Sequence, residues 1–199
     1  MIYILGNGSP VRFFAAGLHG EEWKDTSCLL EQILCMGKEL KIPNSGTLAL
    51  LPRVSTGKYL STLDRRYYSG PGKLLLSALK YLRPEIYIEV HSYSKKNFEN
   101  LTGKARIKRR GVPAFSVLKE GVLLGSVSPF IRQYFPKEAL CLTFEVEKEN
   151  LASKQFALHF LTLIGEMQSK AEFLEFLKKD FPKQAEKAIE DYRRFYGEL

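Results

Sequence analysis

Short segments rich in β-branched and aromatic residues alternate with segments of helical periodicity along most of the chain. The strand-like segments are residues 11–18, 47–51, 85–90 and 140–146, and the helical segments are residues 25–41, 74–82, 129–134 and 151–167. Such alternation is typical of α/β proteins, in which helices connect the strands and cover the sheet. The sequence therefore predicts a single α/β domain over residues 1–199, with a mixed sheet flanked by helices.

Three other segments complete this prediction. Residues 2–5 are expected to pair antiparallel with residues 11–18, because Asn7-Gly8 between them is a favourable hairpin turn. Residues 52–72 show little periodicity and are predicted to form a long loop, a kind of segment that often carries function. An amphipathic pattern broken near Pro182 predicts a C-terminal helical extension over residues 168–199.

The chain has 30 Lys and Arg against 22 Asp and Glu, a net charge of +8 that favours an anionic partner. Most of this excess lies between residues 95 and 110. A basic run is usually a solvated loop, and its functional alternatives are a lid that steers an acidic substrate or a contact with nucleic acid. Only Phe98 interleaves an aromatic ring with these cations, so steering is favoured over nucleic-acid binding.

Three cysteines are too few for a disulfide framework. No run of about 18 apolar residues is present, so no membrane span is predicted. These features predict a cytoplasmic protein.

Two of the three histidines directly follow predicted strands. His19 lies three residues before Glu22, with Gly20 between them to allow a tight turn, and His91 follows a second strand. Two imidazoles and a carboxylate suit Zn²⁺, and three protein ligands leave a position for water, as in catalytic zinc sites. The alternative is that these histidines are hydrogen-bonded structural residues, which is the commoner role of a single histidine at the end of a strand.

Acidic residues near these strand ends are candidates for supporting roles. Glu145, on the last strand, could accept a proton from water and pass it to a leaving nitrogen. Glu147 shares its strand face and is the rival general base. Glu89, two residues before His91, could orient that ligand or simply contact solvent. His159 lies within the apolar segment 151–167 and is expected to be an ordinary helix residue.

Three short motifs resemble those of the zinc carboxypeptidase superfamily, which includes peptidases and an aspartoacylase and succinylglutamate desuccinylase branch. They are GLHGEE at residues 17–22, HSYS at residues 91–94 and TFE at residues 143–145. The resemblance implies a zinc-carboxypeptidase-like fold. It also implies Zn²⁺ ligation by His19, Glu22 and His91, with Glu145 as general base.

The long loop is similar to a substrate-binding stretch of the acylase branch. The similar residues are Leu51-Pro52, Lys58-Tyr59 and LDRRYY at residues 63–68. By this resemblance Arg66 binds the substrate carboxylate, Lys58 replaces the arginine that polarises the scissile carbonyl, and Arg65 replaces an asparagine. Lysine lacks the guanidinium fork, and two adjacent arginines favour a dianionic or phosphate-bearing substrate.

Together these features predict a zinc-dependent hydrolase that cleaves an amide bond next to a carboxylate, with N-acyl amino acid deacylation preferred. The alternatives are a metallocarboxypeptidase and a non-catalytic basic module that binds RNA or protein. The expected partner is a small anionic substrate or a peptide C-terminus, bound by Arg65, Arg66 and Tyr93, while Lys58 or Arg66 stabilises the oxyanion. The basic segment, the C-terminal helices or a second subunit is expected to close the pocket.

Overall fold

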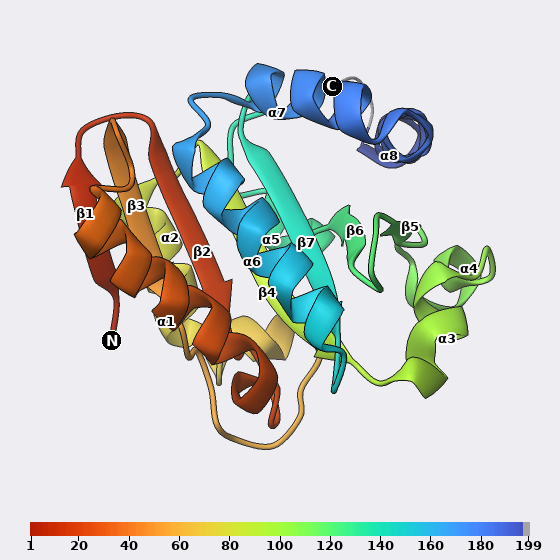
Figure 1. Cartoon of the computed structure of the whole chain (residues 1–199). Coiled ribbons are helices and arrows are strands. Elements are labelled where there is room, and N and C mark those ends of the chain that lie inside the picture. Colours follow the sequence, from red (N-terminus) through yellow and green to blue (C-terminus); the bar gives the residue numbers. More distant parts are fainter. Residues whose placement is uncertain (197–199) are drawn as a thin grey trace.

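A mixed sheet of seven strands, in the order β1-β3-β2-β4-β7-β6-β5, forms the centre of the molecule in the computed structural model, which describes residues 1–196 (Figure 1). The strands are β1 (Tyr3–Asn7), β2 (Val11–Ala16), β3 (Gly46–Leu51), β4 (Ile86–Tyr93), β5 (Ser116–Val117), β6 (Leu123–Ser126) and β7 (Leu140–Glu147). The predicted α/β class with a mixed sheet is confirmed.

The four central strands run parallel. β2 pairs with β3 and β4, and β4 pairs with β7, whereas β1, β5 and β6 join the sheet antiparallel. The carboxyl ends of β2, β3, β4 and β7 therefore lie at one edge, which is where open α/β sheets bind ligands.

The predicted hairpin between the first two strands is wrong. β1 pairs antiparallel with β3, with Gly6 opposite Thr47 and Asn7 opposite Gly46. Both edges of β2 are occupied by the parallel strands β3 and β4, so only the outer edge of β3 remains open to β1. The turn after Asn7 carries the chain across β3 rather than back along β1.

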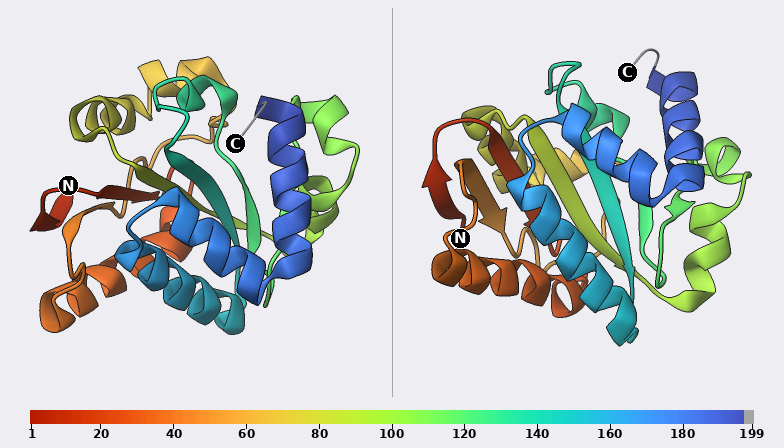
Figure 2. Two further views of the ribbon diagram at one scale, coloured as in Figure 1. Left: turned by 90° about the horizontal axis from the view of Figure 1, so that it is seen from above. Right: turned by 45° about the horizontal axis from the view of Figure 1, so that its top comes forward.

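Helices cover both faces of the sheet (Figure 2). On one face lie α1 (Trp23–Leu40), α6 (Leu151–Glu166) and α7 (Lys170–Asp180), which bury residues such as Leu30 and Phe160 against the strands. On the other lie α2 (Lys73–Leu82), α5 (Pro129–Arg132) and a 3₁₀ helix over Arg65–Ser69. The expected break at Pro182 separates α7 from α8 (Pro182–Tyr196), which contacts β5 and β6.

The basic segment is not the solvated loop that its charge predicts. It forms a 3₁₀ turn (Lys95–Asn97), α3 (Phe98–Thr102) and α4 (Arg106–Arg110). Phe98 and Leu101 pack on a small apolar cluster that includes Tyr93 and Phe115, and this contact holds the helices beside the sheet. Within residues 1–196, no helix is long and apolar enough to cross a membrane.

Candidate metal centre

A tight turn after β2 brings His19 and Glu22 to the same place. Gly17 and Gly20 both have φ of +57°, the left-handed region that glycine adopts without strain. The Gly17 amide donates to Thr26 Oγ1 (3.0 Å), and the Glu22 amide donates to the His19 carbonyl (3.3 Å). These bonds join the strand end to the first turn of α1.

Substitution of Gly17 by alanine should destabilise the protein by at least about 1 kcal/mol, because alanine is strained at positive φ. Its Cβ would also lie 2.7 Å from Trp23 Cβ, too close for a normal contact. Chemical denaturation measures the loss in the free energy of unfolding. Gly57→Ala, in an exposed part of the long loop, is the control, and an equal effect of both changes would contradict this role of Gly17.

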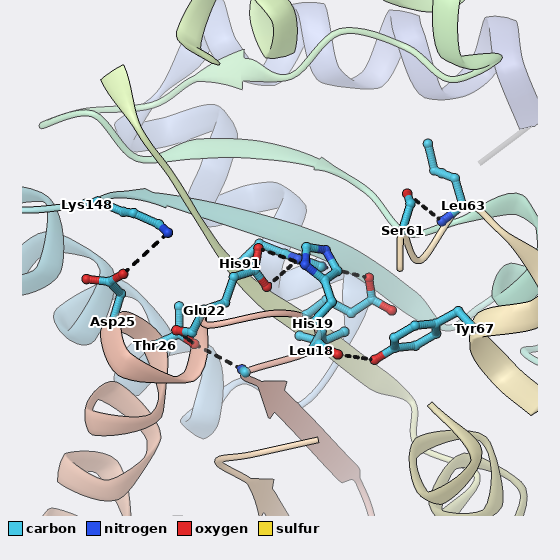
Figure 3. A network of polar contacts seen from close by, with 12 residues as sticks. Leu18, His19, Glu22, Asp25, Thr26, Ser61, Leu63, Tyr67, His91 and Lys148 are labelled. Atoms are coloured by element: carbon cyan, nitrogen blue, oxygen red, sulfur yellow. Dashed lines mark hydrogen bonds and ion pairs between the residues drawn. The ribbon is translucent and has the colours of Figure 1, made fainter. Parts of the chain in front are cut away.

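The side chains of His19, Glu22 and His91 converge at the carboxyl edge of the sheet, although they come from the turn, the start of α1 and β4 (Figure 3). Glu22 Oε1 lies 3.4 Å from His19 Nδ1, and Glu22 Oε2 lies 3.2 Å from His91 Nδ1. All three potential ligand atoms lie within 4.8 Å of one another, and all three residues are buried. The sequence-predicted ligands are therefore brought together.

These residues fit a zinc ion. Ligands at 2.0–2.1 Å from a tetrahedral zinc are separated by about 3.3 Å, close to the two distances from Glu22. His19 Nδ1 is buried and makes no hydrogen bond, although buried polar atoms are rarely left unpaired. Coordination of a cation would satisfy this atom.

The protonation of the two imidazoles is also compatible with metal binding. Burial, reinforced by repulsion from His91, lowers the pKa of His19 to about 4, so its ring is neutral near pH 7, as a metal ligand must be. Burial opposes the charged form of His91, but Glu22 and Glu89 outweigh it and raise the pKa of His91 well above its usual value. A proton on His91 thus supplies positive charge that a bound cation would replace.

Glu89 holds the second nitrogen of His91. Its Oε2 lies 3.4 Å from His91 Nε2, and its Oε1 accepts a hydrogen bond from Tyr87 Oη (3.0 Å). Glu89 is only 1% exposed, so an ordinary solvent contact does not explain it. A carboxylate in this place orients a ligating imidazole and leaves Nδ1 directed at Glu22.

Glu145 lies on the strand next to His91, at the directly opposite position of β7. Burial raises its pKa to about 7, against the opposing charge of His91. Glu147 instead accepts a hydrogen bond from Asn150 Nδ2 (2.7 Å) and is not among the described residues that line the cavity.

A cavity of about 860 Å³ opens above this centre. Besides His19, Glu22, His91 and Glu145, its lining includes Lys58, Tyr59 and Tyr93. Lys58 and Tyr59 are exposed on the long loop, and the Tyr59 ring packs edge-on against His19 with centroids 4.4 Å apart. The Tyr93 hydroxyl donates to the Gly121 carbonyl (2.7 Å). None of the described residues of α7 and α8 lines the cavity.

Arg65 and Arg66 lie outside the described lining of this cavity. Asp64 precedes the 3₁₀ helix that contains them, and its carboxylate caps this helix and binds the exposed Arg66 guanidinium (2.6 Å). Arg65 lies over the Phe130 ring, 5.6 Å from its centroid. The structure does not bring these two arginines to the metal centre.

The arginines that do line the cavity come from α4, and they are Arg106, Arg109 and Arg110. In the sequence these three arginines are part of the basic run over residues 95–110. Their spacing of three and four residues is the signal that could have done so, because a helix places such residues on one face.

Two solved structures have a similar arrangement of helices and strands. A metallo-carboxypeptidase from Pseudomonas aeruginosa, solved in complex with (2-guanidinoethylmercapto)succinic acid, superposes with a TM-score of 0.50 and 12% identity over 82% of this chain. The match covers 59% of that chain, so the present chain spans less than two thirds of its length. An aspartoacylase family protein from Mesorhizobium loti matches with a TM-score of 0.49 and 12% identity, over 85% of this chain and 62% of that one.

The chain belongs to the family DUF2119, described as an uncharacterized protein conserved in archaea, whose model matches residues 7–197. The uncharacterized protein MJ0501 of Methanocaldococcus jannaschii is 36% identical over 186 residues, which cover 92% of this chain and 89% of that protein.

Proposed function

We propose that the protein is a zinc-dependent hydrolase that cleaves an amide bond next to a carboxylate, with N-acyl amino acids as the preferred substrates. The observation that carries the proposal is the convergence of His19, Glu22 and His91 beside Glu145 in one cavity. The resemblance of the three motifs to those of zinc carboxypeptidases supports it.

His19, Glu22 and His91 would hold the metal, and a zinc ion in such a site acidifies water and polarises a carbonyl group. Glu145 accepts a proton as water adds to the amide carbon, and then gives that proton to the nitrogen as the C–N bond breaks. The position of Glu145 opposite His91 on the neighbouring strand supports this role.

Lys58 is the sequence-predicted cation that lines the cavity, so we assign to it the stabilisation of the oxyanion. Lys58 is exposed on the long loop and takes part in none of the ion pairs of the described residues, so it can approach a substrate without breaking one. Glu89 keeps His91 in its orientation and takes no direct part in the reaction.

A metallocarboxypeptidase is the second candidate, because of the size of the cavity. Its volume of about 860 Å³ is near the upper end of the range of about 300–1,000 Å³ for small-molecule sites. It can therefore accept a peptide residue as well as a small acyl group.

Incubation of the zinc-loaded protein with N-acetyl amino acids and with N-blocked dipeptides tests the proposal, with the released amino acids measured by mass spectrometry. We expect the N-acetyl amino acids to be hydrolysed and the activity to be lost with a chelator. Cleavage of the dipeptides alone would instead identify a carboxypeptidase. No cleavage of either class by protein with a full complement of zinc would contradict both candidates.

A further inference from the structure

The two edges of the sheet are protected to different degrees. β5, at one edge, has only two residues and is contacted by α8. β1, at the other edge, has five residues and pairs with β3 along one side, and no other strand within residues 1–196 joins it. Figures 1 and 2 show none of the described helices beyond this edge. The outer backbone groups of β1 are therefore open to pairing with another strand.

β1 lacks the features that usually prevent an edge strand from pairing with another chain. Such edges commonly carry charged side chains, a proline or a bulge. Residues 1–11 contain no charged side chain, and their single proline, Pro10, follows the strand. The register between β1 and β3 is continuous over all five residues of β1, so there is no bulge. Ile4, in the middle of the edge, is 52% exposed, so the edge is apolar as well as unpaired.

The distribution of charge favours a second copy of the chain as the partner. Two copies with a net charge of +8 repel each other where their basic surfaces meet. Most of the excess lies between residues 95 and 110, which form α3 and α4 at the opposite end of the sheet from β1 (Figure 1). Pairing through the uncharged β1 keeps the two basic segments far apart. An acidic protein or a nucleic acid, in contrast, would gain no electrostatic attraction from this edge.

We propose that β1 pairs antiparallel with β1 of a second copy of this chain, about a two-fold axis perpendicular to the sheet, so that the two sheets become one. Two-fold contacts, in which both subunits use the same surface, are the commonest kind in homo-oligomers. None of the described residues of β1 lines the cavity, so the contact does not involve the metal centre. The inference therefore concerns assembly and does not depend on the proposed hydrolysis.

The conformation of β1 selects the register of this pairing. Gly6 has φ of +67°, outside the extended region, so the extended part of the strand is residues 3–5, with Ile4 at its centre. A two-fold axis at Ile4 places this residue opposite Ile4 of the partner subunit, and Tyr3 opposite Leu5 of the partner subunit. The two half-exposed isoleucine side chains then lie on the same face, where directly opposite Cβ atoms are about 4.5–5.5 Å apart.

The last turn of α1 enlarges the contact. A specific interface buries about 800 Å² on each partner, which is more than a strand of five residues supplies. α1 contacts β1, and it does so closely, because a Cβ at Gly37 would lie only 2.4 Å from Leu5 Cδ1. The proposed axis keeps the two α1 helices on the same face of the joined sheet. Leu40, in the last turn of α1, is 62% exposed and is available to pack against the second copy.

Sedimentation equilibrium of the full chain measures the oligomeric state, and we expect a mass twice the 22.7 kDa of one chain. Ile4→Lys places like charges opposite each other at the edge and should weaken dimerisation by about tenfold or more. Circular dichroism should be unchanged, because the side chain is already half exposed. Ile107→Lys is the matched control, since Ile107 is 44% exposed on α4, at the other end of the sheet, and this variant should keep the dimer.

Cysteine cross-linking tests the register without relying on a loss of dimer. The exposed Cys35 is first replaced by serine. In this background Ile4→Cys should form a disulfide between two chains under oxidising conditions, because directly opposite residues have the Cα separation of about 4.4–6.8 Å that a disulfide needs. Ile107→Cys in the same background should form none.

A wild type that is monomeric at every soluble concentration would overturn the proposal. So would a dimer that Ile4→Lys and Ile107→Lys weaken equally, or one that cross-links through Ile107→Cys but not through Ile4→Cys. A dimer that Ile4→Lys disrupts but that Ile4→Cys does not cross-link would exclude the register centred on Ile4.

Discussion

Replacement of His91 by alanine is expected to remove bound zinc from the purified protein and to abolish its hydrolytic activity. His91 supplies one of only two imidazoles in the described cluster, and Glu22 would be left with His19 as its one partner there. Loss of a residue that merely supports a ligand weakens metal binding by about 10- to 100-fold, so loss of the ligand itself should exceed about 100-fold. Elemental analysis of the dialysed protein measures the zinc content.

His159→Ala is the matched control, because His159 is exposed on α6 and lies outside the cluster. It should retain the wild-type zinc content. Thermal unfolding gives a second readout, since an ion that binds the folded state raises its melting temperature. Added zinc should raise this temperature for the wild type and for His159→Ala but not for His91→Ala. Equal zinc in all three proteins would exclude His91 as a ligand.

The convergence of the three candidate metal ligands could be predicted from the sequence because they lie near the ends of strands. His91 ends an apolar β-rich segment, and Gly17 and Gly20 mark the turn that places His19 beside it. In a parallel sheet the carboxyl ends of neighbouring strands lie at one edge. Segments about 70 residues apart in the sequence are therefore expected to lie close together in the fold.

The positions of the cations could not be predicted in the same way. Arg65 and Arg66 match a motif by spacing, but the local ion pair between Arg66 and Asp64 holds that side chain at the surface. In contrast, the basic segment packs beside the sheet through two apolar residues, Phe98 and Leu101. Two apolar residues within a run of charged residues form no recognisable amphipathic pattern. Such placement depends on tertiary packing that is not local in sequence.

The order of the strands in the sheet could not be predicted from the sequence either. The Asn7-Gly8 turn is compatible with a hairpin, but the hydrogen-bonding edges of β2 are taken by strands that follow much later. The two-residue β5 and the short β6 lack a pattern long enough to distinguish them from loop.

Glu145→Gln is expected to lower kcat/KM by about 100- to 10,000-fold while the protein keeps its zinc, because glutamine retains the shape of the side chain but cannot accept the proton. Glu145 is not in the cluster of potential ligands, and its place opposite His91 puts it beside the metal centre. Steady-state kinetics and elemental analysis of the same preparation separate the two effects.

Glu147→Gln tests whether the loss of activity is specific to Glu145 or follows from the removal of any carboxylate near the end of β7. Glu147 is two residues further along β7, but its carboxylate is held by Asn150 and it is not among the described lining residues of the cavity. We expect this variant to keep nearly full activity.

If Glu147→Gln lost activity and Glu145→Gln retained it, Glu147 and not Glu145 would transfer the proton. If Glu145→Gln lost its zinc as well, the residue would act on the metal site rather than on the substrate. Only loss of turnover at full zinc occupancy assigns the proton transfer to Glu145.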